Sequence, residues 1–285
     1  MIPASLCASY INCVWVMYSV GMGNEMAVLV CQAAKDLPML ESINVRDNNL
    51  TCTGICAVLK LAISIPTLVS LNIGENKLGD ESSSLLHEYL MHDNCHISKL
   101  GLKNADVDDI ECNRFIADVS TKGDMKELDL SSNKLGMLES LNAVLPDTVT
   151  AGESLAELLT EHADNKCRLE KLDLSWNMIR MEGAYKLAEA MTNNKYLTSL
   201  NLAYNSFGSE AGTMLGKAVS ALHLYGLFSL LHILFSLPIF YFFIIFLCTL
   251  LTAGDVQQNS EIFEHFQQWH RRKCLYYYMP GAGTE

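Results

Sequence analysis

Residues 169–187 read LEKLDLSWNMIRMEGAYKL, and the pattern within them recurs through most of the chain. Leucine or isoleucine stands at positions 169, 172, 174 and 179, with Asn177 between the last two. This is the phrase L-x-x-L-x-L-x-x-N-x-L, and it returns as LTSLNLAYNSF, starting at Leu197. A phrase that recurs at a fixed period indicates stacked structural repeats.

Six copies of the phrase can be aligned, and their start positions differ successively by 28, 29, 28, 44 and 28. In each copy the L-x-L core predicts a short strand whose side chains alternate between two faces. The residues that follow place apolar side chains three and four positions apart, which is typical of a helix. Such units bury little apolar surface alone, so we expect an α/β solenoid of about six to seven strand–helix units, with the strands on a concave inner face. The copies begin at Leu40, Leu68, Ile97, Met125, Leu169 and Leu197.

The asparagine of the phrase has a structural explanation. Its amide can donate to and accept from backbone groups left unpaired where the chain turns off the strand. Stacked repeats should therefore build a ladder of asparagines. Ala105 interrupts it in the third copy, so the turn there needs another donor or a water. The predicted ladder consists of Asn48, Asn76, Asn133, Asn177 and Asn205.

Residues 1–39 are interpreted as a degenerate first repeat or N-terminal cap. One repeat period before Leu40 stands Asn12, and apolar residues occupy the repeat positions after it. A signal peptide is the alternative, because residues 2–23 carry no charge. The positively charged start of a signal peptide is missing, which favours the repeat.

The regular repeats are assigned to residues 40–222. The single longer spacing, between Met125 and Leu169, predicts an insertion near residues 136–150, where Pro146 and Asp147 favour a turn. Such an insertion would project from one rim of the solenoid, either as a binding element or as a neutral loop.

The repeat pattern stops near Leu222. Residues 224–251 contain no Asp, Glu, Lys or Arg, and about 20 apolar residues suffice to cross a bilayer. Residues 223–252 are therefore a separate hydrophobic segment and a possible transmembrane helix, followed by a polar and aromatic tail at 253–285. Two interpretations stay open, a genuine single-pass anchor and an aberrant C-terminus joined to the repeats.

Charge and cysteine content narrow the choice of partner and compartment. The formal net charge of −12 argues against nucleic acid and favours a protein partner with a neutral or basic surface. The ten cysteines are scattered singly, which predicts buried, reduced thiols and a cytoplasmic location. A single-pass membrane protein is the alternative.

Two rows of side chains should line the concave face. One lies between the strand apolars and is partly acidic, and the other precedes the ladder asparagine and changes from acidic to aromatic along the chain. Exposed aromatic rings beside acidic groups are favoured in protein-binding hot spots, although rings at these positions could simply cover the strand edge. The predicted protein-binding residues are Asp47, Glu75, Asp129, Asp173, Trp176, Asn201 and Tyr204.

No catalytic residue, metal site or cofactor is predicted. His92, Cys95 and His96 lack a second ligand pair at zinc spacing. The acidic run at 106–111 lacks the central glycine and closing glutamate of a calcium loop, so its carboxylates are expected to be solvated. The stretch TCTGIC at 51–56 lies on a turn and helix start and is not a redox motif. Phosphate-binding glycine loops and nucleophile motifs are also missing.

The repeating units, with LxxLxLxxNxL followed by a helix of the form G-x-x-x-L-A-x-A, resemble ribonuclease-inhibitor-type leucine-rich repeats. The resemblance covers residues 20–222 and is closest to proteins of the leucine-rich-repeat-containing protein 74 kind and to the repeat arrays of NOD-like receptors. It implies a horseshoe that binds proteins in the cytosol. Some relatives, such as the Ran GTPase-activating proteins, regulate a GTPase, but their acidic C-terminal tract and arginine have no match here.

The sequence therefore favours a non-enzymatic protein-interaction scaffold that uses its concave strand face. A membrane-anchored leucine-rich repeat receptor-like protein is the first alternative. A GTPase-activating regulator of the Ran activator type is the second.

Overall fold

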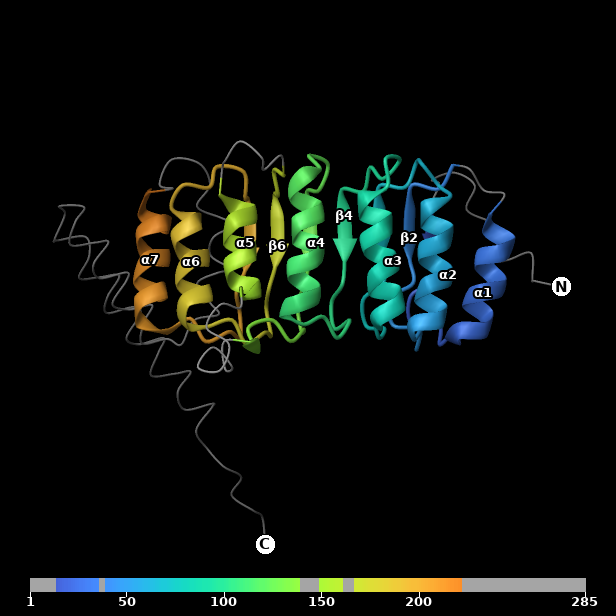
Figure 1. Cartoon of the computed structure of the whole chain (residues 1–285), viewed down its shortest axis with the longest axis horizontal. Coiled ribbons are helices and arrows are strands. Elements are labelled where there is room, and N and C mark those ends of the chain that lie inside the picture. The colour runs from blue at the N-terminus through green and yellow to red at the C-terminus, as the bar shows by residue number, and fades with distance from the viewer. Residues whose placement is uncertain (1–13, 36–38, 139–148, 161–166, 222–285) are drawn as a thin grey trace, which may run out of the picture. The chain divides into compact units, whose positions relative to one another are not determined.

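The computed structural model describes residues 14–35, 39–138, 149–160 and 167–221 of the 285-residue chain. Within them, seven strands alternate with seven helices (Figure 1). The strands are β1 (Val14–Val16), β2 (Ser42–Asn44), β3 (Ser70–Asn72), β4 (Lys99–Gly101), β5 (Glu127–Asp129), β6 (Lys171–Asp173) and β7 (Ser199–Asn201). The helices are α1 (Gly23–Ala34), α2 (Cys52–Ile63), α3 (Asp80–Met91), α4 (Asp109–Thr121), α5 (Ala151–Leu159), α6 (Met181–Met191) and α7 (Gly208–Ala221).

The strands form one parallel sheet in chain order, β1 to β7. Each strand pairs with the next at the repeat spacing, so that Ser42 lies opposite Ser70 and Ser70 opposite Lys99. Parallel neighbours require a crossover connection, and here each crossover is one helix on the same side of the sheet (Figure 1). This is the predicted α/β leucine-rich repeat solenoid.

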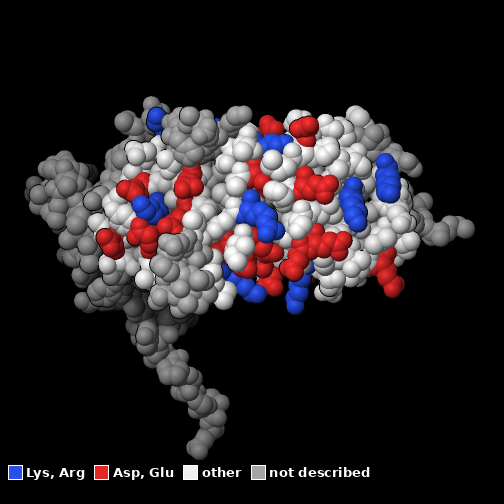
Figure 2. Space-filling view, viewed as in Figure 1, with Lys and Arg blue, Asp and Glu red and all other residues white. Residues whose placement is uncertain are grey.

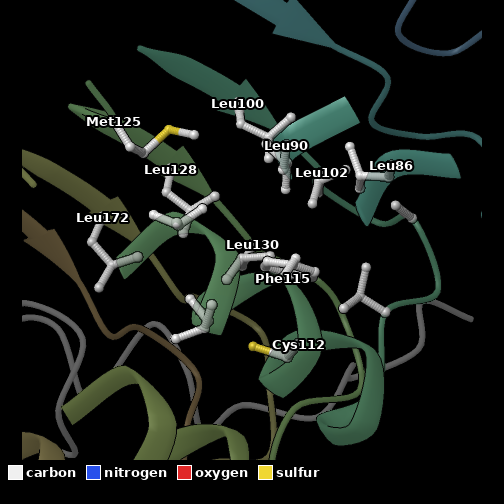
Figure 3. Close-up of a cluster of buried hydrophobic side chains, with 14 of the residues drawn as sticks. Leu86, Leu90, Leu100, Leu102, Cys112, Phe115, Met125, Leu128, Leu130 and Leu172 are labelled. Atoms are coloured by element: carbon white, nitrogen blue, oxygen red, sulfur yellow. The ribbon is translucent and has the colours of Figure 1, made fainter. Parts of the chain in front are cut away.

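The core lies between the sheet and the row of helices. Figure 3 shows Leu100 and Leu102 of the β4 repeat pointing toward Phe115 of α4, with Leu128 from the neighbouring repeat against them. All four side chains are buried. The buried apolar residues of successive units form one continuous cluster, so each repeat is stabilised by its neighbours rather than by a core of its own.

The ladder asparagines join each repeat to the one before it. Asn76 is typical, because its Nδ2 donates to the carbonyls of Ile73 and Gly74 in its own unit and of Val45 in the preceding unit, at 3.0 Å each. Its Oδ1 accepts the N–H groups of Asn48 and Leu50, also at 3.0 Å. One side chain thus serves five backbone groups in two units.

Ala105 leaves one gap in this ladder. At the corresponding place in the preceding unit, the N–H of Leu50 donates to the Asn76 side chain. The N–H of Leu78 instead donates to the backbone carbonyl of Ala105, at 3.0 Å. A main-chain acceptor therefore takes over one of the bonds that the missing amide would have made.

The additional residues of the long repeat lie between its strand and its helix. In that repeat β5 starts at Glu127 and α5 starts only at Ala151, whereas in an ordinary repeat β3 starts at Ser70 and α3 already at Asp80. Residues 139–148, most of the predicted insertion, lie outside the described part of the chain.

The two ends of this insertion are held by one buried carboxylate, Asp109 at the start of α4. Its Oδ1 accepts the N–H groups of Gly136 at 2.8 Å and Ala151 at 2.9 Å, and its Oδ2 accepts that of Leu138 at 3.0 Å. The expectation that the carboxylates of residues 106–111 are solvated is therefore wrong for Asp109, which is completely buried. The reason is that Gly136, Leu138 and Ala151, the described residues at the two ends of the insertion, enclose the start of α4.

None of the helices within the described ranges is long and apolar enough to cross a membrane. The hydrophobic segment 223–252 and the tail 253–285 fall outside those ranges, as do residues 1–13. Residues 14–34 contain a strand paired in register with β2, followed by a helix.

The ladder can be tested by removing one amide. Asn76→Ala should lower the free energy of unfolding by about 3 kcal/mol or more, because buried N–H and C=O groups lose their partner. Urea unfolding followed by circular dichroism measures the change. Asn193→Ala, at an exposed asparagine, should change stability by less than about 0.5 kcal/mol. Equal losses in the two variants would contradict the assigned role.

The buried carboxylate gives a second prediction. Asp109→Ala should lower the free energy of unfolding by about 3 kcal/mol, since three N–H groups lose their acceptor. Asp109→Asn retains Oδ1 and should cost less, because only the bond from Leu138 is lost. Asp93→Ala, at an exposed carboxylate, is the control, and all three can be compared by urea unfolding. A native-like stability of Asp109→Ala would refute the role of this side chain.

Candidate protein-binding face

The residue before the ladder position has a left-handed backbone in every repeat. This conformation is uncommon for any residue except glycine, and asparagine and aspartate tolerate it best. The turn that leads off each strand imposes it at the same place. The φ values are 55° for Ser19, 56° for Asp47, 55° for Glu75, 47° for Asn104, 59° for Ser132, 58° for Trp176 and 57° for Tyr204.

Trp176 and Tyr204 occupy this strained position in the last two repeats and form an aromatic pair. Their ring centroids are 3.7 Å apart and their planes differ by 16°, so the rings stack face to face. Both remain in solvent, with 58% of Trp176 and 62% of Tyr204 exposed. The turn itself does not call for large rings, because the other repeats use Ser, Asp, Glu or Asn at this position.

The inner row of polar residues on the strands has a structural task as well. Oδ1 of Asp129 accepts the backbone N–H of Ser131 at 3.0 Å and its hydroxyl at 2.6 Å. Asp173 holds Ser175 in the same way, at 2.9 Å and 2.6 Å. These bonds stabilise the turn after each strand and leave the second carboxylate oxygen of each residue for other partners.

Asp129 and Asp173 form an acidic pair beside the aromatic rings. They lie opposite each other in the register of β5 and β6. Oδ2 of Asp173 accepts a hydrogen bond from Nδ2 of Asn201, at 3.0 Å. Within the described residues neither carboxylate forms an ion pair with a Lys or Arg, so their negative charge is uncompensated.

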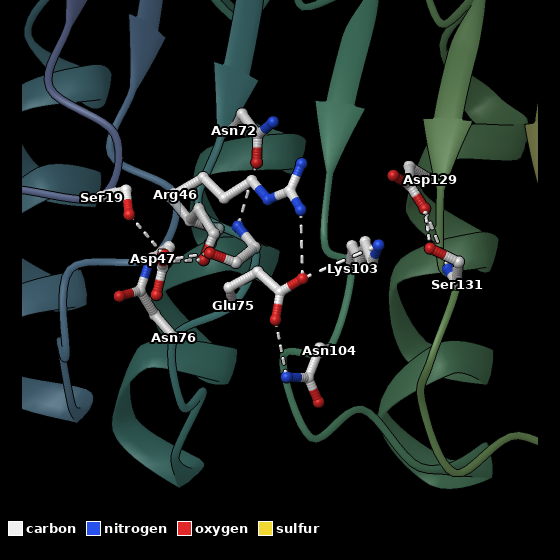
Figure 4. A network of polar contacts seen from close by, with 12 residues as sticks. Ser19, Arg46, Asp47, Asn72, Glu75, Asn76, Lys103, Asn104, Asp129 and Ser131 are labelled. Atoms are coloured by element: carbon white, nitrogen blue, oxygen red, sulfur yellow. Dashed lines mark hydrogen bonds and ion pairs between the residues drawn. The ribbon is translucent and has the colours of Figure 1, made fainter. Parts of the chain in front are cut away.

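At the other end of the face, Glu75 is ion-paired within the chain, while Asp47 accepts only a neutral hydroxyl group. Figure 4 shows Glu75 between Arg46 and Lys103, with N···O distances of 3.1 Å and 3.7 Å, while Asn104 donates to it at 2.8 Å. Asp47 accepts the hydroxyl of Ser19 at 2.7 Å. Of the acidic residues predicted from sequence, Glu75 is therefore neutralised within the chain, whereas Asp47, Asp129 and Asp173 form no ion pair with Lys or Arg among the described residues.

Glu127, at the start of β5, is neutralised too. Lys99 and Lys171 each lie 3.0 Å from its carboxylate. Burial alone would raise the pKa of Glu127, but the hydrogen bonds from the two lysines outweigh burial and lower the pKa. On the opposite, helix-covered side, acidic and basic side chains are interspersed (Figure 2). What distinguishes Asp129 and Asp173 is that their unpaired carboxylates lie in the same part of the strand face as the stacked rings of Trp176 and Tyr204.

One group of metal-capable side chains was missed from the sequence. Ligand atoms of Cys52, Cys56 and Glu81 lie within 4.8 Å of one another. Glu81 belongs to the repeat after that of Cys52, so local spacing does not reveal the cluster. The repeat period could have revealed it, because both residues fall at the start of adjacent helices. His96, considered from sequence, instead lies 3.3 Å from Asp124.

Comparison with known proteins agrees with the fold. A family model described as Leucine Rich repeat matches residues 64–84, 165–188 and 193–216. With the in-register strands and the helical crossovers, these matches show that the chain is a leucine-rich repeat protein.

The similar proteins are longer than this chain. Ribonuclease inhibitor from Sus scrofa is 27% identical over 191 residues, covering 65% of this chain and 38% of that protein. The Mus musculus ribonuclease inhibitor is 28% identical over 202 residues, covering 70% and 40%. NACHT, LRR and PYD domains-containing protein 3 of Rattus norvegicus is 30% identical over 157 residues, covering 54% and 13%. The chain thus spans less than half the length of these relatives. Leucine-rich repeats of this kind serve generally as protein-interaction scaffolds.

The strain at the aromatic position can be measured. Trp176→Gly should be more stable than Trp176→Ala by about 1 kcal/mol, because glycine adopts positive φ freely and alanine does not. At Met178, an exposed neighbour outside the left-handed positions, glycine should instead be the less stable of the two. Urea unfolding of the four variants tests the contrast. If glycine were less stable than alanine at Trp176 as well, the backbone there would be unstrained.

Proposed function

We propose that the chain binds a partner protein through the aromatic and acidic end of its strand face. This site comprises Trp176, Tyr204, Asp129, Asp173 and Asn201. The observation that carries the proposal is the stacked, solvent-exposed pair of rings at strained backbone positions. The turn imposes the left-handed backbone in every described repeat, but only these two repeats place large rings there, and rigid aromatic side chains are common anchors in protein interfaces.

The chemistry of the site favours a basic partner surface. Asp129 and Asp173 are uncompensated, whereas Glu75 and Glu127 are matched by lysine or arginine within the chain. A guanidinium group could stack on the exposed ring face while it pairs with a carboxylate. The formal charge of −12 would also attract a basic protein over a distance.

A cytosolic location is part of the same proposal. The six described cysteines, at positions 31, 52, 56, 95, 112 and 167, are present as thiols rather than disulfides. Burial raises the pKa of Cys31 to about 12, which keeps that thiol protonated and unreactive at neutral pH. Thiols of this kind are typical of a reducing compartment.

The alternatives rest on the sequence alone. A membrane-anchored receptor depends on residues 224–251, which are outside the described ranges. GTPase activation depends on the resemblance to the Ran activators, and no described feature of the site favours it.

The proposed face can be tested with the full chain as bait. Partners captured from a cell extract should bind at least tenfold less to the double variant Trp176→Ala and Tyr204→Ala, because both ring anchors are lost; hot-spot residues contribute about 2 kcal/mol or more each. The matched control is Tyr18→Ala, an equally exposed tyrosine in the first repeat, which should leave capture unchanged.

The acidic pair gives an independent arm of that experiment. Asp129→Asn with Asp173→Asn keeps the turn hydrogen bonds through Oδ1 but removes the charge. Capture should weaken, and its dependence on salt should become shallower. Circular dichroism confirms folding of every variant. Partners retained equally by the ring variant and the Tyr18 control would rule out this face.

A further inference from the structure

Two thiols and a carboxylate converge where α2 and α3 begin. Cys52 is the first residue of α2 and Cys56 lies one turn later, with their sulfur atoms 4.0 Å apart. Glu81 lies in the first turn of α3, and the three ligand atoms fall within 4.8 Å of one another. Two thiolates bound to one tetrahedral Zn²⁺ at about 2.3 Å would stand roughly 3.8 Å apart, close to the observed spacing.

The leucine-rich repeat does not require these two cysteines. Cys31 occupies the buried position that Leu59 fills in the next repeat and belongs to the continuous apolar core, whereas Cys56 is equally buried but lies outside that core. The positions of Cys52 and Cys56 have no such apolar consensus. Counterparts of Cys52 in later helices are Asp80, Asp109, Ala151 and Met181, and those of Cys56 are Ser84, Asn113, Leu155 and Tyr185. The pairing of two thiols at this one place therefore needs another explanation.

The first turn of α2 is held rigidly from the preceding repeat. Oδ1 of Asn24 in α1 accepts the N–H groups of Thr51 at 3.0 Å and Gly54 at 3.1 Å. Its Nδ2 donates to the Thr51 hydroxyl at 2.8 Å. The backbone that carries Cys52 is thus fixed before any ion binds, which is what a preorganised ligand set requires.

The first turn of α3 is fixed against the thiols. A Cβ atom at Gly79 would lie 3.1 Å from Cβ of Cys52 and 3.5 Å from its sulfur, so glycine lets α3 begin close to this cysteine. The N–H of Gly79 donates to the hydroxyl of Ser82 at 2.9 Å. Glu81 stands between these two residues in sequence, so its backbone is fixed beside the thiol pair while its side chain stays exposed to solvent.

The surroundings favour a complex with net negative charge. Two thiolates and one carboxylate around a divalent cation carry one negative charge, and both helices present their N-termini, where negative charge is stabilised. Binding would release one proton from each thiol to solvent.

We propose that Cys52, Cys56 and Glu81 form a binding site for a thiophilic divalent cation, with Zn²⁺ as the ion that suits them best. Thiolate ligands select Zn²⁺ over Mg²⁺ or Ca²⁺, which prefer oxygen. Three protein ligands leave the fourth tetrahedral position to a water molecule. The bound ion would join α2 to α3 and so link two adjacent repeats.

The test compares the full chain with Cys52→Ser plus Cys56→Ser, both kept reduced with a phosphine. After loading with Zn²⁺ and gel filtration, the parent chain should retain one zinc equivalent more than the double variant. With Co²⁺ as probe, the thiolate-to-cobalt absorption should be weaker in the variant. The difference between proteins is decisive, because the chain has ten cysteines in all. Equal zinc content and equal cobalt spectra would overturn the proposal.

A second pair of variants leaves both thiols in place. Glu81→Gln should weaken retention of Zn²⁺ against a competing chelator, whereas Asp80→Asn, at the adjacent exposed carboxylate, should not. This comparison decides the matter even if the serine variant fails to fold. Retention that is the same in Glu81→Gln and Asp80→Asn would exclude Glu81 and with it the three-ligand site.

Discussion

The two-sided hydrogen bonding of the ladder asparagine is the interaction on which the repeat array depends. Each strand is very short, so the sheet alone leaves backbone groups unpaired where the chain turns away. A side-chain amide offers two donors and two acceptor lone pairs in one rigid group, which no other neutral side chain of this size except glutamine provides. Asn76 uses both ends at once and bridges two units. The same residue therefore both stabilises the turn in its own unit and links that unit to the one before it.

The fixed turn explains why the surface beside it can vary so widely. The ladder holds the backbone after each strand in one conformation, and the residue before the asparagine is left with positive φ and an outward side chain. Small polar residues accept this position at modest cost. Trp176 and Tyr204 accept it only with strain, and their stacking recovers part of the cost. Variation of one residue per repeat thus changes the exposed chemistry and leaves the core intact.

The sequence predicts the architecture well because the repeat period alone determines how successive strands and helices stack. The period between phrases becomes the register between neighbouring strands, and it also places Trp176 and Tyr204 in adjacent units. The period brings residues of adjacent repeats side by side, but it does not say which of their side chains will pair across the boundary. Glu75 is neutralised from the units on either side, and Asp109 is enclosed by residues of the next unit at the two ends of the insertion. The thiols of α2 meet their carboxylate only in the next unit. A motif within one repeat reveals none of these three sets of contacts.

Because Asp109 binds the backbone at both ends of the insertion, the stability of the repeat array should depend little on the length of the insertion. Its carboxylate fixes Gly136 and Leu138 on one side and Ala151 on the other, so the ends stay in place whatever joins them. Closing a longer loop between fixed ends costs only about 0.6 kcal/mol for each doubling of its length. This rim is therefore a natural graft site, where peptides of different length could be displayed on the scaffold without redesign of its repeats.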